Sequence, residues 1–166
     1  VDAPFFNSTA GLQGWKGSVN EGGIRVPAIV RWPGKIEAGS MTSAPSYFPD
    51  WFPTLCKAAG VKIPKELDGS DLTPALTKKS FERSKPMIWE FHGYGGQLAV
   101  IDFPWKIVRK KVKSKKPGKW QLYDIRKDPA EDNDLAKQNP EIVNRLEAAF
   151  KKDRTPNARA KLPLYD

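Results

Sequence analysis

Between residues 87 and 124, short apolar segments alternate with turn-forming residues, and this pattern limits the possible folds more than any other feature of the chain. Four segments have the length and the β-branched and aromatic content of strands: residues 87–91, 97–101, 105–112 and 120–124. A glycine-rich loop follows the first segment, and a Pro-Gly turn follows the third. Such short connections join antiparallel neighbours, so the sequence predicts a four-stranded antiparallel meander.

Residues 140–152 have the clearest helical pattern in the chain. Asn139 is a suitable N-cap residue, and Pro140 is tolerated in the first turn of a helix. Apolar residues recur on one face of this segment: Ile142, Val143, Leu146, Ala149 and Phe150. We expect this stripe to cover one face of the sheet, which makes the fold class α+β.

The glycine-rich stretch from Gly11 to Pro33 contains one lysine, Lys16, before its apolar part, and one carboxylate, Glu21. The following residues, 24–30, are rich in β-branched side chains and predict a largely buried strand. A loop that presents one cation at the edge of a buried strand is a common way to build an anion site. An ordinary surface loop with a solvated lysine is the alternative interpretation.

Residues 50–60 predict a short amphipathic helix, with Asp50 at its N-cap and Gly60 just after its end. Its apolar face consists of Phe52, Leu55, Cys56 and Ala59. Cys56 is the only cysteine, which excludes an internal disulfide and a multi-cysteine metal site, and we expect it to be a buried, inert thiol. The polar segment at residues 78–85 marks the main boundary between the two halves of the chain.

The formal net charge is +9, and much of it is concentrated between residues 106 and 119. The basic residues of this strip are Lys106, Arg109, Lys110, Lys111, Lys113, Lys115, Lys116 and Lys119. Such a strip suits nucleic acid, acidic lipid or a sulfated polysaccharide, or it is a solvated hairpin edge. No nucleic-acid-binding signature accompanies the charge. No apolar segment reaches the ~18–20 residues that cross a bilayer.

The sequence offers few residues for histidine or metal chemistry. His92 is the only histidine, so a Ser-His-Asp triad or a histidine-rich zinc site has very little material. The acidic turn at residues 128–134 resembles a calcium loop only loosely, because it lacks the glycine and the closing glutamate of an EF-hand. We therefore expect its carboxylates to cap backbone groups, and we assign no metal ligand.

Several motifs resemble the C-terminal signature of the arylsulfatase-type, formylglycine-dependent sulfatases. In chain order they are Leu12–Gly17, Glu21–Gly34, Asp50–Leu55, Leu67–Ser70, Trp89–His92, and Leu122–Asp124 with Asp128–Pro129. The resemblance implies that residues 1–79 are the end of a large α/β catalytic domain that includes the active-site loop, a strand and short helices. It implies that residues 80–166 form a small antiparallel-sheet subdomain with the helix at residues 140–152.

The resemblance also implies a reaction, the hydrolysis of sulfate esters, and roles for two residues. Lys16 matches the family lysine that contacts the sulfate group, so it is the candidate catalytic and substrate-binding residue. His92 is a candidate substrate-binding residue, or else a structural one. The family's calcium ligands and formylglycine would lie outside this chain, since Cys56 is not within the Cys-x-Pro-x-Arg type of motif. Gln13 replaces the arginine that usually braces this loop, and Arg25 is expected to brace it or to pair with Glu21.

We therefore expect the C-terminal part of a sulfatase whose substrate is a sulfated carbohydrate or an aryl sulfate, and whose isolated fragment is inactive. Its expected partner is the missing N-terminal catalytic portion, and self-association of the fragment would cover the same surfaces. No nucleic-acid partner and no membrane span are expected. The resemblance implies an extracytoplasmic location, although no signal peptide is visible, and the missing initiator Met suggests that something upstream was removed. The alternative is a non-catalytic module that binds a sulfated glycan or another polyanion through the lysine-rich strand.

Overall fold

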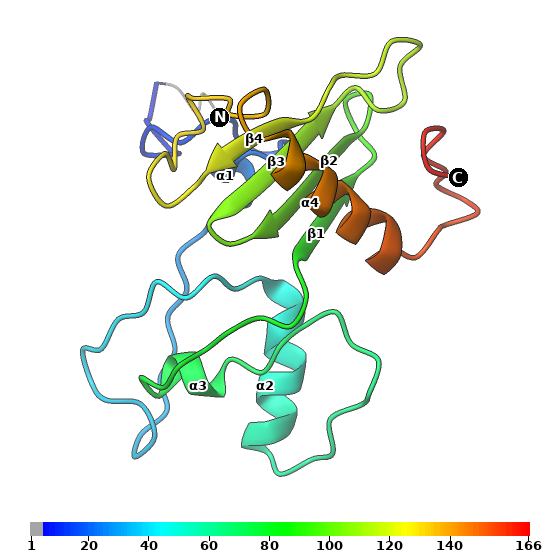
Figure 1. The fold of residues 1–166 in the computed structure, drawn as a ribbon. Helices are drawn as coiled ribbons and strands as arrows, with labels where there is room; N and C mark the ends of the chain where they lie inside the picture. Colours follow the sequence, from blue (N-terminus) through cyan, green and yellow to red (C-terminus); the bar gives the residue numbers. More distant parts are fainter. Residues whose placement is uncertain (1–4) are drawn as a thin grey trace. The chain divides into compact units, whose positions relative to one another are not determined.

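The computed structural model describes residues 5–166, and the chain divides into two compact units (Figure 1). The sheet unit contains the chain up to Val26 together with Ile88–Asp166, and the middle unit contains Pro27–Met87. The N-terminal segment therefore belongs with the sheet, although more than 60 residues separate them in the sequence. The expected division into residues 1–79 and 80–166 concerns the organisation of a longer enzyme and stays a prediction.

The sheet has four strands in the order β1-β2-β3-β4, as the sequence predicts. Their bounds are β1 Met87–Phe91, β2 Gln97–Asp102, β3 Trp105–Lys110 and β4 Gln121–Asp124. β2 and β3 are antiparallel with Val100 opposite Ile107, and β3 and β4 are antiparallel with Ile107 opposite Leu122. These three side chains are fully buried and form the centre of the core.

The helix α4, Pro140–Asp153, contacts β2 and β3 through the predicted stripe. Phe150 is 0% exposed, and its ring meets those of Trp120 and Tyr165 edge-on. The α+β fold class is therefore confirmed. One detail of the prediction is wrong: Asn139 occupies the N-cap position but does not cap the helix with its side chain, because its amide donates a hydrogen bond to the carbonyl of Leu135.

The middle unit contains η1 (Phe48–Asp50), α2 (Trp51–Ala58) and α3 (Thr73–Leu76). The predicted helix is present, but its predicted apolar face is largely exposed, with Phe52 54% and Leu55 62% exposed. The buried side of α2 is Pro53 and Thr54 instead. The Thr54 hydroxyl donates to the carbonyl of Asp50 and accepts the Leu72 N–H, so a polar contact decides which face turns inward.

The predicted buried strand at residues 24–30 is absent. The first of these residues ends the single helical turn α1, Glu21–Ile24, and the rest belong to no helix or strand. Val26 is 77% exposed and Ile29 is 97% exposed. A strand needs a neighbour for its N–H and C=O groups, and no strand of the described residues pairs with this segment.

None of the helices within residues 5–166 is long and apolar enough to cross a membrane. The longest of them, α4, has 14 residues and a charged outer face.

Candidate anion site

Lys16 lies at the tip of a tight turn in the sheet unit. The Ser18 N–H donates to the Trp15 carbonyl at 2.9 Å, which closes the turn around Lys16 and Gly17. Gly17 has φ +88°, as the third residue of a type II turn requires. The side chain of Lys16 is exposed. The turn therefore presents a single ammonium group to solvent.

The helical turn α1 packs directly beneath this lysine turn. The Gly22 N–H donates to the Gln13 carbonyl at 2.8 Å. A Cβ atom on Gly22 would lie 2.3 Å from the Gly14 carbonyl oxygen, and one on Gly23 would lie 2.1 Å from the Ser18 carbonyl oxygen. The two glycines are needed because the backbones of the turn and of α1 touch here.

Two residues, one within the glycine-rich β1–β2 loop and one directly after it, also hold the lysine turn. Gln97, the first residue of β2, donates from Nε2 to the Gly17 carbonyl at 2.8 Å and accepts the Val19 N–H at 3.4 Å. The ring of Tyr94 covers Gly17 so closely that a Cβ atom there would lie 2.4 Å from ring atom Cε2. The structure thus brings the lysine turn beside the loop that follows His92.

A buried ion cluster fixes α1 to the sheet. The Lys106 ammonium lies 2.7 Å from Glu21 Oε1 and 2.9 Å from Glu131 Oε1, and Lys106 is 0% exposed. Glu131 also accepts the Glu21 N–H at 2.7 Å. Arg25 lies 3.7 Å from Glu21, in agreement with the expected pairing. Removing one member of such a cluster leaves an uncompensated buried charge, so it constrains the position of α1 strongly.

The charges of the cluster also affect the pKa of the nearby Lys110. Burial lowers the pKa of Lys110, and the charge of Lys106 acts in the same direction, whereas Glu131 opposes them. Gln13 donates from its side-chain amide to the Glu131 carbonyl at 3.3 Å. This hydrogen bond ties the segment just before the lysine turn to the acidic turn.

His92 lies just after β1. One of its ring nitrogens lies near a carboxylate, and the other has no hydrogen-bond partner among the described residues. Its Nε2 is 3.6 Å from the Glu90 carboxylate, which in turn accepts a hydrogen bond from Arg154 at 2.7 Å. Hydrogen bonds to Asp166 and, with a smaller effect, to Glu90 raise the pKa of Arg154. The buried Nδ1 of His92 has no hydrogen-bond partner among the described residues. The side chains of His92 and Lys16 belong to one unit, but no hydrogen bond or ion pair joins them.

The structure corrects the predicted lysine strip in two places. Lys106 is inside the molecule, and Arg109 donates to the Gly118 carbonyl at 2.7 Å and to the Tyr165 hydroxyl at 3.0 Å. The remaining exposed lysines lie on the β3–β4 connection: Lys111, Lys113, Lys115, Lys116 and Lys119. A run of basic residues in the sequence does not show which of them turn inward, because strand side chains alternate between faces.

The carboxylates of the acidic turn bind backbone groups, as predicted. Asp128 accepts the N–H groups of Asp132 and Asn133, and Asp134 accepts that of Leu122. Glu131 does both, because it accepts the Glu21 N–H and also pairs with Lys106. No group of three or more His, Cys, Asp or Glu side chains within residues 5–166 could hold a metal ion.

Sequence reasoning missed Gln97, Lys106 and Glu131 as supports of the site. Lys106 offered a local signal, since it stands between the apolar residues Trp105 and Ile107 within a strand. Gln97 and Glu131 offered none, because their partners lie 80 and 110 residues away in the sequence.

Comparison with known proteins gives a consistent result. Residues 13–155 match the family described as N-sulphoglucosamine sulphohydrolase, C-terminal. The chain is 30% identical over 170 residues to the N-acetylglucosamine-6-O-sulfatase of Bacteroides thetaiotaomicron, covering 90% of this chain and 30% of that protein. It is 32% identical over 147 residues to arylsulfatase K of Xenopus laevis, covering 81% of this chain and 27% of that protein.

Solved structures share the fold. The crystal structure of Ps i-CgsB covers 87% of this chain with a TM-score of 0.74 and 30% identity, and the match takes in 32% of that chain. The same protein in complex with k-i-k-neocarrahexaose has a TM-score of 0.76. This chain thus spans less than one third of the length of each of these relatives.

Proposed function

This chain belongs to the sulfatase family, as a C-terminal region of it, and we propose that it supplies the sulfate-contacting lysine of a longer enzyme that hydrolyses sulfate esters of a carbohydrate. Relatives that are named as carbohydrate sulfatases support this substrate class. The observation that carries the proposal is the placement of Lys16. Its ammonium is exposed on a turn that is held in two ways: by the packing of α1, which the Lys106 ion cluster fixes to the sheet, and by the two hydrogen bonds of Gln97.

A lysine on a turn whose backbone is fixed suits the chemistry of sulfate transfer. Negative charge shifts between the sulfate oxygens and the leaving oxygen as the S–O bond breaks, and a preplaced hydrogen-bond donor stabilises that change without moving. Loss of one such donor commonly lowers kcat by about 10²–10³-fold. Lys16 would donate to a sulfate oxygen, while α1 and Gln97 keep its backbone in place.

The sulfatase family uses formylglycine and calcium, and the described residues do not fit either one. They contain no cluster of metal-binding side chains. Cys56 is half-buried on α2 and is followed by Lys57, so it does not match the motif that is converted to formylglycine. Both groups would come from the N-terminal portion, and the isolated chain is expected to be inactive. Turnover of an aryl sulfate by the purified chain would contradict this expectation.

The proposed partner of this chain is that N-terminal portion. The exposed apolar side chains of Val26 and Ile29 follow directly after α1 and would be covered by it. Self-association would cover the same side chains in the isolated fragment. We also propose an extracytoplasmic location for the enzyme, on the basis of its family resemblance.

The direct test replaces Lys16 in the full-length enzyme. Lys16→Ala is expected to lower kcat/KM for a sulfated sugar by about 10²-fold or more. Lys127→Ala, which removes another exposed lysine of the sheet unit, is the matched control and should leave the rate unchanged. Equal rates for wild type and Lys16→Ala would remove Lys16 from the site.

A second test asks whether the position of the turn matters. Gly17→Ala and Gly11→Ala both place a side chain at positive φ, but only the first meets an atom within 4 Å, the ring of Tyr94. Gly17→Ala should therefore lower kcat/KM far more than Gly11→Ala does. Adding Tyr94→Ala should restore part of the loss, and no restoration would mean that the ring does not position the turn.

The role of His92 can be separated in the same enzyme. If His92 binds the sugar, His92→Gln should raise KM and leave Tm unchanged. A fall in Tm with an unchanged KM would instead assign His92 to the Glu90–Arg154 network.

A further inference from the structure

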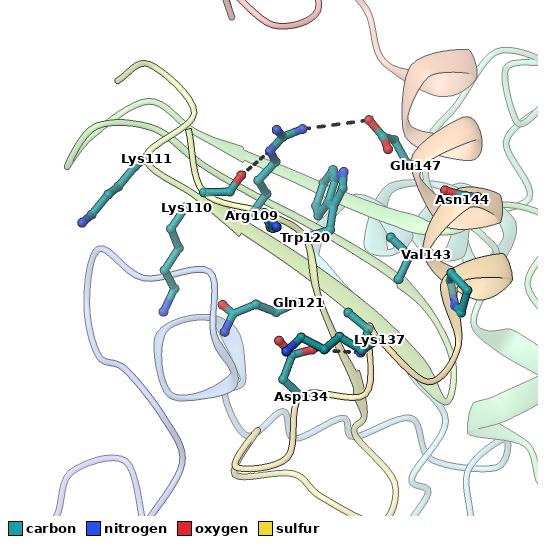
Figure 2. Close-up of a pocket in the computed structure, with 14 residues that line it drawn as sticks. Arg109, Lys110, Lys111, Trp120, Gln121, Asp134, Lys137, Val143, Asn144 and Glu147 are labelled. Carbon is teal, nitrogen blue, oxygen red and sulfur yellow. Dashed lines mark hydrogen bonds and ion pairs between the residues drawn. The ribbon is translucent and has the colours of Figure 1, made fainter. Parts of the chain in front are cut away.

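A groove in the sheet unit lies apart from the lysine turn. It has a volume of about 770 Å³ and runs between the end of β3, the start of β4, the segment before α4 and α4 itself (Figure 2). None of its lining residues comes from residues 11–24. Its volume falls within the range of about 300–1,000 Å³ that is usual for small-molecule sites.

The acidic side chains of the groove are already engaged within the chain. Asp134 accepts the N–H groups of Leu122 and Ala136, each at 3.0 Å. Glu147 lies 3.2 Å from the Lys151 ammonium and also accepts the Tyr165 hydroxyl. Their charges are therefore partly balanced before any ligand arrives.

The lysines of the groove are not balanced in this way. Four of them line it: Lys110, Lys111, Lys119 and Lys137. None of the four makes an ion pair with any of residues 5–166, and all but Lys110 are exposed. The groove thus carries an excess of positive charge, and the exposed ammonium groups of Lys111, Lys119 and Lys137 can meet an anion.

Neutral polar groups lie between the lysines. Gln121 on β4 and Asn144 on α4 also line the groove, and Figure 2 shows Gln121 extending toward Lys110. Their amides can exchange hydrogen bonds with hydroxyl groups. Trp120 also lines it but is only 9% exposed, so its ring is not available as a stacking surface for a nucleic-acid base. The lining combines separated cations with amides that can bind hydroxyl groups. A sulfated sugar chain carries the complementary groups, namely separated sulfates and hydroxyls.

We propose that this groove binds a sulfated oligosaccharide at a second site, separate from the site of Lys16. Sulfate groups would pair with Lys111, Lys119 and Lys137, and sugar hydroxyls would bond to Gln121 and Asn144. A sulfatase with such a groove could hold one part of a polymeric substrate while another part reaches the reacting centre. The inference goes beyond the proposed function and does not depend on Lys16.

The test measures binding of a heparin-derived hexasaccharide to the full chain by calorimetry. The triple variant Lys111→Gln, Lys119→Gln, Lys137→Gln should bind at least about tenfold more weakly, because three charge-assisted contacts are lost. The control triple Lys35→Gln, Lys62→Gln, Lys65→Gln changes the net charge equally in the middle unit. It should weaken binding by less than about threefold. Equal losses in both triples would overturn the proposal.

A charge-neutral variant tests the groove itself. Asn144 is exposed on α4, so Asn144→Trp should fill the groove while the chain stays folded, and it should weaken binding by about tenfold. Unchanged binding would show that the hexasaccharide sits elsewhere. Removal of the sulfates from the hexasaccharide should abolish binding, and a single-stranded oligonucleotide that binds more tightly would overturn the choice of ligand. Lys16→Ala should leave the affinity unchanged, which separates this site from the catalytic proposal.

Discussion

The sheet unit and the middle unit treat their apolar side chains in opposite ways. In the sheet unit, Leu98, Val100 and Phe150 are 0% exposed and belong to one continuous core. In residues 27–87, the buried hydrophobic residues are Leu72, Ala75 and Met87. Large apolar side chains of the same segment are exposed: Ile29 97%, Met41 94%, Phe48 89%, Leu55 62% and Phe52 54%.

The middle unit has a polar centre in place of an apolar core. Asp50 is 0% exposed, accepts the N–H groups of Tyr47 and Ser70, and pairs with both terminal nitrogens of Arg83 at 2.7 and 2.9 Å. A buried, doubly bonded ion pair fixes geometry but adds little net stability compared with apolar packing. Helical periodicity thus predicted an apolar face for both α4 and α2, but only the face of α4 is buried within this chain. The surface that covers an apolar face need not lie in the same chain.

The largest expected effect tests the apolar core directly. Phe150→Ala removes a fully buried ring and should lower the free energy of unfolding of the chain by about 4 kcal/mol. Phe52→Ala, the matched change on the exposed face of α2, should alter it by less than about 0.5 kcal/mol. Urea denaturation followed by tryptophan fluorescence gives both values, and similar losses would erase the contrast between the units.

The next effect concerns the polar centre. Asp50→Ala leaves the buried guanidinium of Arg83 without its partner and should destabilise the middle unit by about 3 kcal/mol. Hydrogen exchange should then accelerate at the Ser70 and Leu72 amides, while those of Val100 and Ile107 remain protected. Faster exchange in both units would show that they unfold as one.

A smaller effect is expected from pH in the middle unit. Burial raises the pKa of Asp71, but hydrogen bonds from Thr73 and Lys57 outweigh it and hold the pKa below its ordinary value. A lowered folded-state pKa stabilises the chain above the unfolded-state value, and this contribution is lost as the pH falls through the folded-state value. Between pH 6 and pH 3 the loss should be no more than about 1 kcal/mol, because Lys57 is solvent-screened. Asp71→Asn should remove this part of the pH dependence, which denaturation at several pH values would reveal.

The smallest effect on stability is expected at the exposed segment after α1. Ile29→Ser should change the free energy of unfolding by less than about 0.5 kcal/mol, because the side chain is 97% exposed. The same variant should reduce self-association of the isolated chain in sedimentation equilibrium. A large loss of stability would mean that the segment is packed in solution, contrary to the exposure of Ile29 in the structure.

Local sequence patterns were sufficient to locate the helices and strands where neighbours along the chain are also neighbours in space. The four strands follow one another through short connections, and α4 carries its own apolar stripe, so periodicity and turn residues located them to within a few residues. The same reasoning failed for residues 24–30. Their composition favours a strand, but a strand forms only when another strand pairs with it.

The candidate site shows the same limit. The resemblance pointed to Lys16, and the glycines around it indicated a loop. The supports of that turn depend on residues that are distant in sequence, namely Gln97, Lys106 and Glu131.

The sequence by itself determined the sheet, the helix that covers it, and the family to which the chain belongs, because these depend on local patterns and on motifs. Only the tertiary structure decided that Lys106 lies inside the molecule between Glu21 and Glu131 rather than on a basic surface strip. The reason is physical: the burial of a charge depends on whether opposite charges from distant segments arrive to balance it.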